Sequence, residues 1–315
     1  MQSTPVTTTL SKFPEKPITT IVPFGAGGGL DLTTRSLEKI ALNHLGQPLI
    51  IINKPGSAGA LGWNELAGAS PDGYTIGATS SEMVLLSLYG SGKYNYLTAL
   101  TPLAQVTSLP MLLAVQADKP WRTLNDLIDY AKQHPGELKF GNAGVGSFAH
   151  VLGEMFSYDT GINTVQVPFS GGGEMTTALL GGHVQLIFVN PVSIKEHVKN
   201  GTVRILALTG EHRLNDSVFV QVPTFKEQGF DITLTNWHGV AVPKELPMDV
   251  KNKLEEKFKT IIMDPEFTKN MSNIGMPVEY LGSQDAQSKW QADSQKLQKT
   301  LQESGILEQI KAQRK

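Results

Sequence analysis

Short stretches of apolar and β-branched residues alternate with helical patterns along most of the chain. Residues 18–22 fit a strand, and residues 49–52 fit a second one, whose lack of polar alternation is typical of a strand covered on both faces. Between them, Leu30, Leu37 and Ala41 recur at the spacing of one helical face. This alternation predicts an α/β protein built mostly from parallel strands.

The alternation continues through the second half of the chain. Apolar runs at residues 111–115 and 184–189 predict further strands, and residues 123–132 predict a helix that begins with a capping box of Thr123 and Asp126. The sequence contains no internal repeat and no long linker rich in Gly, Ser or Pro. If the chain forms two domains, it therefore crosses between them more than once.

The composition limits the class of protein and the kinds of site. With 315 residues, 40% hydrophobic and 18% charged, the chain suits one large or two moderate domains. A net charge of -2 without a long run of like charges indicates no nucleic-acid partner. The absence of cysteine excludes disulfides, thiolate zinc sites and iron–sulfur clusters. No apolar run reaches the roughly 20 residues of a membrane-spanning helix. We expect no metal and no cofactor.

Three glycine-rich loops each follow a predicted strand and precede a predicted helix. They comprise residues 23–31, 141–147 and 168–174. Glycine lets the backbone approach a ligand closely, and the start of a helix presents free N–H groups with a partial positive charge. Such loops bind anions without a basic side chain, and in an open α/β sheet they converge on one crevice. The loops therefore indicate a site for an anionic ligand.

Other motif interpretations fail on inspection. A dinucleotide fingerprint requires glycine where Leu30 stands, and no Gly-Lys-Ser/Thr follows any glycine loop. No serine lies in a Gly-x-Ser-x-Gly elbow, no histidines have metal-ligand spacing, and no two acidic residues pair as acid and base. A single loop of this kind is more often a tight turn, and we interpret Asp31, His150 and His183 as structural. The prediction of a site rests on the three loops together.

At these loops the sequence resembles the Bug (TctC-like) family, the substrate-binding proteins of tripartite tricarboxylate transporters. The resemblance runs in order from about residue 16 to the C-terminal helix. The matching segments are KPI at 16–18, PFGAGGGLD at 23–31, NKPGSAG at 53–59, SPDGYT at 70–75, GVGS at 144–147 with His150, VPF at 167–169, LLGGHV at 179–184, VPT at 222–224 and WHG at 237–239. As an ordered set, these segments are highly specific.

The resemblance implies a two-lobed periplasmic-binding-protein fold (type II-like), with mixed, mostly parallel sheets and a ligand cleft between the lobes. Lobe 1 would combine residues 16–101 and 223–315, lobe 2 would comprise residues 102–222, and residues 1–15 would form a tail. The resemblance also implies a periplasmic or cell-surface location and delivery of the ligand to membrane permease subunits. No export signal is recognisable in the polar opening of the chain. We expect a monomer.

The family pattern also suggests which residues bind the ligand. In such proteins backbone amides, small hydroxyl groups and waters hold a ligand carboxylate, with little help from arginine. By position, the resemblance assigns this role to Phe24, Ala26, Gly27, Ser80, Ser81, Asn142, Ala143, Ser147, Ser170, Gly172 and Asn190.

The sequence departs from the family pattern at four places. Many relatives have acidic residues where Gln185 and Val189 stand, a lysine at Ser170, and Ala-Pro at Gly173-Glu174. Loss of an acidic group beside the cleft weakens a site for a ligand ammonium group. On this basis the resemblance favours ligands other than amino acids.

We therefore expect a binding protein for a small carboxylate: a dicarboxylate, a tricarboxylate or an aromatic acid. Two alternatives stay open. One is an enzyme that acts on a carboxylate substrate, for which the sequence offers no catalytic constellation. The other is a ligand-sensing protein that docks on a receptor.

Overall fold

The computed structural model describes residues 12–313, so most of the predicted tail, residues 1–15, lies outside the described residues. The strands are β1 (Ile18–Val22), β2 (Leu49–Asn53), β3 (Thr75–Ser80), β4 (Leu100–Pro110), β5 (Leu112–Gln116), β6 (Lys139–Asn142), β7 (Val165–Pro168), β8 (Leu186–Val189), β9 (Val203–Leu208), β10 (Thr235–Pro243) and β11 (Leu281–Gly282). The α-helices are α1 (Gly29–Leu45), α2 (Ala60–Ala67), α3 (Ser81–Tyr89), α4 (Tyr96–Ala99), α5 (Leu124–Gln133), α6 (Phe148–Thr160), α7 (Gly172–Leu180), α8 (Pro191–Lys199), α9 (Met248–Ile262), α10 (Pro265–Asn273), α11 (Ser283–Glu303) and α12 (Ile306–Gln313). Short 3₁₀ turns occur at Ser57–Gly59 and Lys226–Gln228.

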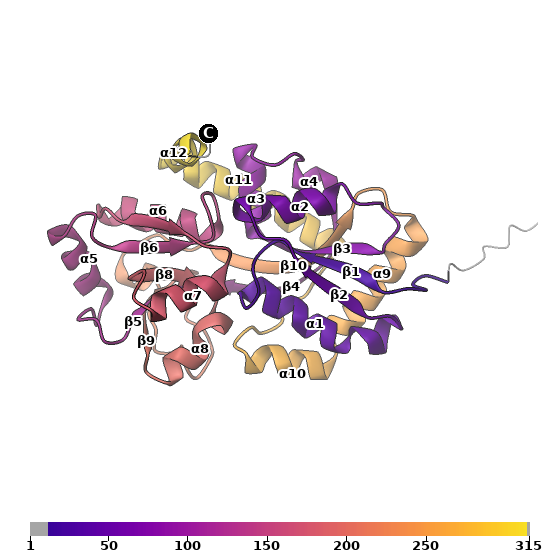
Figure 1. Cartoon of the computed structure of the whole chain (residues 1–315), viewed down its shortest axis with the longest axis horizontal. Coiled ribbons are helices and arrows are strands. Elements are labelled where there is room, and N and C mark those ends of the chain that lie inside the picture. The colour runs from indigo at the N-terminus through magenta and orange to yellow at the C-terminus, as the bar shows by residue number, and fades with distance from the viewer. Residues whose placement is uncertain (1–11, 314–315) are drawn as a thin grey trace, which may run out of the picture.

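The strands form two separate sheets, each with helices packed around it (Figure 1). We call the half built on the order β11-β4-β10-β3-β1-β2 the first lobe, and the half built on β7-β6-β8-β5-β9 the second lobe. Strand β4 lies entirely in the first sheet, and the chain enters the second sheet at β5. It returns to the first sheet along β10. The lobe bounds at residues 102 and 222 remain a prediction.

Both sheets are mixed. Strand β1 pairs in parallel with β2 and β3, and β6 pairs in parallel with β7 and β8. The strands that carry the chain between the lobes pair antiparallel: β10 with β3 and β4, and β5 with β8 and β9. Because the chain leaves the first lobe along β4 and returns along β10, these neighbours run in opposite directions. The expected predominance of parallel pairs is therefore not found.

The local signals of the sequence explain where several elements begin and end. Helix α5 begins at the predicted capping box, in which the Thr123 hydroxyl accepts from the Asp126 amide and the Asp126 carboxylate accepts from the Thr123 amide. Helices α1 and α6 end at Gly46 and Gly161, both in the left-handed conformation that glycine adopts without strain. Among the described residues, no helix is both long and apolar enough to cross a membrane.

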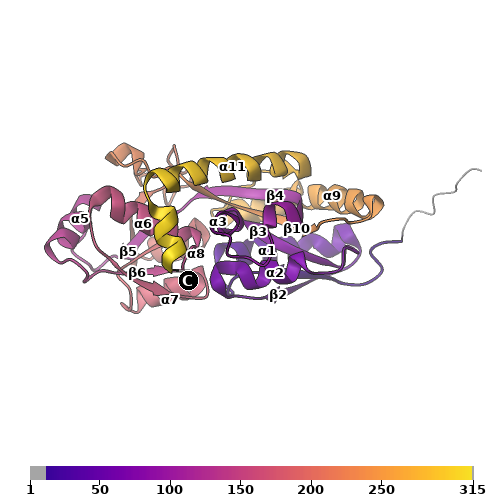
Figure 2. The same ribbon diagram turned by 90° about the horizontal axis from the view of Figure 1, so that it is seen from above.

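The C-terminal helices bind the two lobes together. Helix α11 lies along β4 and α3 of the first lobe, and α12 packs against α3 and against α6 of the second lobe (Figure 2). Trp290 of α11 stacks on Trp237 of β10 with ring centroids 5.8 Å apart, and the Trp237 indole donates to Asp293 at 2.8 Å. These contacts fix α11 onto the strand by which the chain returns to the first lobe.

Candidate ligand-binding cleft

Two connected hollows lie where the lobes face each other. The inner cavity offers about 50 Å³ to water-sized molecules, and the outer pocket, open to solvent, offers about 460 Å³. Phe24 of the first lobe and Ala143 of the second line both hollows. The inner space corresponds to a few waters, at roughly 10–15 Å³ each. A ligand held between the touching lobes is therefore small, or it extends past Phe24 into the outer pocket.

The lobes touch through the first and third glycine loops. The Gly25 amide donates to the Ser170 carbonyl at 3.0 Å across the cleft. A Cβ atom added to Gly173 would lie 2.6 Å from the Ala26 carbonyl oxygen, and one added to Gly171 would lie 3.2 Å from the Gly25 nitrogen. Because these distances leave no room for side chains, glycine is what allows the two backbones to meet.

Four helices begin at the inner cavity: α1, α3, α7 and α8. Their N-cap residues are Gly28, Ser80, Gly171 and Asn190, and none of these caps its helix with a side-chain hydrogen bond. The first amides of a helix have no partner within it and carry a partial positive charge. Helices α1 and α7 therefore direct backbone donors at the cavity, whereas α8 begins with Pro191, which has no N–H group, and the Ser193 amide already donates to the Asn190 carbonyl at 3.1 Å.

Asp31 in the first turn of α1 braces the first glycine loop. Its carboxylate accepts from the Gly27 amide, the Arg35 guanidinium and the Asn53 amide group, each at 2.9 Å. Burial alone would raise the pKa of Asp31, but these hydrogen bonds and the charge of Arg35 outweigh burial and hold the pKa below its ordinary value. Asp31 is therefore a structural residue, fully occupied with the loop that it supports.

Two further ionisable residues line the inner cavity and are themselves buried. His238 of β10 contacts the Thr33 hydroxyl through Nδ1 at 2.9 Å, and burial lowers the pKa of His238 to about 3. Glu82, in the first turn of α3, receives a weak hydrogen bond from the Asn236 amide at 3.4 Å. Burial raises the pKa of Glu82, and its interactions with Ser80, its own amide and Asn236 offset only part of that effect. Burial thus favours the neutral form of both side chains, the unprotonated imidazole of His238 and the protonated carboxyl group of Glu82.

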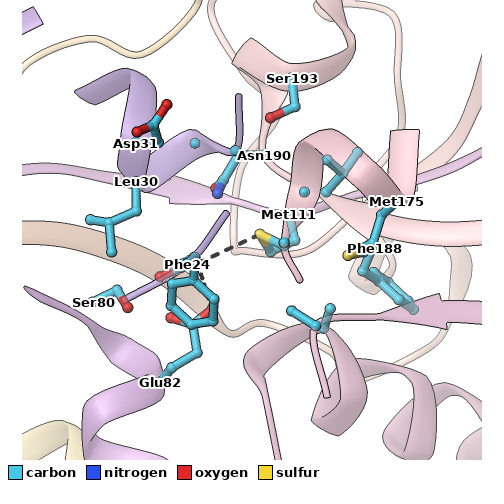
Figure 3. A pocket seen from close by; sticks show the side chains of 18 of the residues that line it. Phe24, Leu30, Asp31, Ser80, Glu82, Met111, Met175, Phe188, Asn190 and Ser193 are labelled. Atoms are coloured by element: carbon cyan, nitrogen blue, oxygen red, sulfur yellow. Dashed lines mark hydrogen bonds between the residues drawn. The ribbon is translucent and has the colours of Figure 1, made fainter. Parts of the chain in front are cut away.

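The residues assigned from the sequence fall into two groups. Those that line the inner cavity are Phe24, Ser80, Ala143, Gly172 and Asn190, and Ser170 lines the outer pocket. Figure 3 shows Phe24 between Ser80 of the first lobe and Asn190 of the second. The structure thus brings together residues that are far apart in the sequence and come from both lobes.

The remaining five, Ala26, Gly27, Ser81, Asn142 and Ser147, line neither hollow. The Ser81 hydroxyl donates to Asn236 at 2.6 Å. Asn142 accepts from the Gly144 amide at 2.9 Å, and Ser147 caps α6 by accepting from the His150 amide at 3.2 Å. The side chains of Asn142 and Ser147 thus support the loop in which they lie, and Ser81 is bonded to β10.

Sequence reasoning missed several lining residues. Those that bear polar or sulfur atoms are Glu82, Met111, Met175, Ser193, Asn236 and His238. Glu82 could have been predicted from the sequence, because it directly follows the assigned pair Ser80 and Ser81 at the start of a helix. Met111, between β4 and β5, and Asn236 on β10 reach the cavity only through the tertiary arrangement of the strands, which no local pattern reveals. Across residues 12–313, no three His, Asp or Glu side chains gather as metal ligands.

Two α/β lobes, a cleft between them and helix starts facing that cleft define a periplasmic-binding-protein fold. The chain belongs to the TctC family, the receptors of tripartite tricarboxylate transporters, because the model of this family matches residues 33–306. As a member of this family of binding proteins, it is not an enzyme.

The chain is similar in sequence to proteins of two bacteria. It is 35% identical to the protein BugT of Bordetella pertussis over 236 residues, 74% of this chain and 72% of BugT. It is 32% identical over 273 residues to a UPF0065 protein in the gbd 5' region of Cupriavidus necator, 87% of this chain and 83% of that protein.

Solved structures agree with this assignment. The periplasmic binding protein BugD superposes with a TM-score of 0.89 at 28% identity, covering 93% of this chain and 99% of BugD. An R. palustris protein solved with adipate superposes with a TM-score of 0.87 at 28% identity, covering 93% and 98%. MatC from Rhodopseudomonas palustris, solved with bound malate, superposes with a TM-score of 0.80 at 25% identity, covering 95% and 100%.

Proposed function

We propose that the protein is an extracytoplasmic solute-binding protein that captures a small carboxylate in the cleft between its lobes. One observation carries this proposal: the uncapped starts of α1, α7 and α8 meet at the inner cavity, where the amides of α1 and α7 suit a carboxylate. Neither hollow has a lysine or arginine among its lining residues. Backbone dipoles are therefore the main source of positive potential for an anion.

The similar structures support a carboxylate as the ligand. One relative was solved with adipate and another with malate, both dicarboxylates. In this protein the pairs Gly28–Gly172 and Gly29–Asn190 place the starts of α1, α7 and α8 in mutual contact. A single carboxylate between them would accept hydrogen bonds from both lobes at once.

Such two-lobed contact gives a mechanism for capture. A ligand that bonds to both lobes binds the closed form more tightly than the open form and shifts the population toward closure. The Gly25–Ser170 hydrogen bond across the cleft forms only when the lobes meet. We expect the closed form to be what the membrane permease of a tripartite tricarboxylate-type transporter recognises. The protein would act as a monomer in the periplasm or at the cell surface.

Native mass spectrometry with a panel of small carboxylic acids tests the proposal, with melting temperature followed in parallel. The panel contains mono-, di- and tricarboxylates, aromatic acids, and amino acids. A ligand at 100 times its Kd stabilises the folded state by about 2.7 kcal/mol, so the true ligand raises the melting temperature clearly. If no acid in the panel adds mass or raises the melting temperature, the proposal of a carboxylate ligand is wrong.

A further inference from the structure

The inner cavity has two chemically different sides. Figure 3 shows Asn190 and Ser193 on one side, and Ser80 and Glu82 on the other, with Phe24 between them. The first side is formed by the starts of α1, α7 and α8. The second side is the start of α3, which already has a carboxylate of its own in Glu82.

Glu82 is a buried acid without a counter-ion. Glu82 is 8% exposed, and its Oε2 atom makes no hydrogen bond with any described residue. Its carboxyl group interacts only with neutral groups, namely the Ser80 side chain, its own backbone amide and the Asn236 amide at 3.4 Å, and no cationic side chain acts on it. A buried carboxylate in this state is costly unless a cation or a proton joins it.

The two sides together have the polarity of a zwitterion. Helix starts attract a carboxylate, and an unpaired buried carboxylate attracts an ammonium group. A dicarboxylate would instead bring a second negative charge next to Glu82 in a cavity that has no lysine or arginine among its lining residues and whose histidine, His238, is held neutral by burial. The arrangement therefore discriminates between ligands by the group that faces Glu82.

We infer that Glu82 is the specificity-determining residue of the cleft and binds the ammonium group of a small amino-acid ligand whose carboxylate lies at the starts of α1, α7 and α8. This inference rests on the proposed carboxylate-binding function and narrows it. It differs from the expectation drawn from the sequence, which considered Gln185 and Val189. Gln185 lies away from both hollows, where it accepts from the Lys139 amide at 2.9 Å. The acidic residue of this cleft, Glu82, lies in the first lobe, whereas Gln185 lies in the second.

The test compares ligands that differ by one amino group: aspartate with succinate, and alanine with propionate. Affinities of the whole protein are measured by titration calorimetry at pH 7. We expect one amino acid to bind at least about tenfold more tightly than its partner, since its ammonium group pairs with a desolvated carboxylate. We expect Glu82→Gln, which removes the charge at nearly constant shape, to reduce this preference to about threefold or less.

Glu266→Gln is the matched control. Glu266 occupies the same first-turn position of α10 that Glu82 occupies in α3, but it is exposed and far from the cleft. The control variant should keep the full preference. Circular dichroism establishes that both variants are folded. If Glu82→Gln does not fold, the wild-type comparison still tests the preference for an amino acid, and absence of that preference overturns the inference.

Three outcomes overturn the inference or its basis, and they are distinguishable. Tighter binding of succinate or propionate by the wild type would mean that Glu82 is protonated and donates to a ligand carboxylate. An amino-acid preference that survives Glu82→Gln would place the ammonium group elsewhere. In both cases carboxylate binding stands and only the inference fails. If no ligand of either pair nor of the wider acid panel binds, the proposed function itself fails.

Discussion

The glycine-rich loops of residues 23–31 and 168–174 bond to each other across the cleft, whereas the loop of residues 141–147 bonds within its own lobe and approaches the first lobe at Ala58, 3.3 Å from where a Cβ atom of Gly144 would lie. In the meeting pair, backbone touches backbone through Gly25 and Ser170. In the loop of residues 141–147, the amides of Gly144 and Gly146 donate to Asn142 and His150 of the same lobe, at 2.9 and 3.1 Å. The same glycine-rich signature thus serves lobe closure in one place and local loop structure in the other.

This difference predicts that substitutions lower ligand affinity in the two meeting loops and lower stability in the loop of residues 141–147. In Gly173→Ala the new methyl group would lie 2.6 Å from the Ala26 carbonyl oxygen of the opposite lobe. Overpacking of this kind costs about 1–3 kcal/mol, so we expect ligand affinity to fall about 5- to 150-fold. The melting temperature without ligand should hold or rise, because alanine favours the helix in which it lies. Titration calorimetry and thermal unfolding measure the two effects.

Gly172→Ala sharpens this experiment. Its methyl group would meet nothing closer than the Gly28 Cα at 3.5 Å, an ordinary contact. We expect a smaller loss of affinity than for Gly173→Ala. Equal losses in the two variants would mean that crowding against Ala26 does not limit closure.

The buried histidine that contacts α1, the helix that follows the loop of residues 23–31, predicts a pH effect on stability. His238, which contacts Thr33 of α1, has a pKa lowered from 6.5 to about 3 by burial. Below pH 6.5 the histidine binds a proton in the unfolded chain but stays unprotonated in the folded protein. The contribution of His238 to the free energy of unfolding is therefore greatest above pH 6.5 and declines toward pH 3. Between pH 7 and pH 5 the expected loss is about 2 kcal/mol.

Denaturant unfolding at a series of pH values, compared between wild type and His238→Gln, isolates this contribution. The contribution of Glu82 to the pH dependence of stability has the opposite sign, because its raised pKa favours the folded state as pH falls. The difference between wild type and variant cancels that contribution. Parallel curves for the two proteins between pH 7 and pH 5 would contradict the assignment to His238.

The loop of residues 141–147 gives the smallest expected effect. Ser147→Ala removes the cap of α6 and should lower stability by about 1 kcal/mol. Because Ser147 lines neither hollow, ligand affinity should stay close to that of the wild type. An affinity loss of about tenfold or more with unchanged stability would instead support the direct ligand contact that the family pattern suggests.

The sequence predicted the fold class, the capping box of α5 and the family. These rest on local patterns or on an ordered set of motifs, which need no tertiary information. It also located Ser80 and Asn190 at strand-to-helix junctions, where the side chain of the junction faces the cleft. It could not tell which glycine loop meets its partner, because that depends on how the two lobes are placed. Glu82 was missed because a first-turn glutamate is ordinarily an exposed residue, as Glu266 is.

Helix α12 offers a way to observe the protein at work. It packs on α3 of one lobe and α6 of the other, and Gln309 donates to Glu154 of α6 at 2.6 Å. Any hinge motion must therefore shift at least one of these contacts. Since the chain has no cysteine, Glu308→Cys would provide a single thiol on the exposed side of this helix. An environment-sensitive dye attached there would turn the protein into an optical sensor for whichever acid closes it.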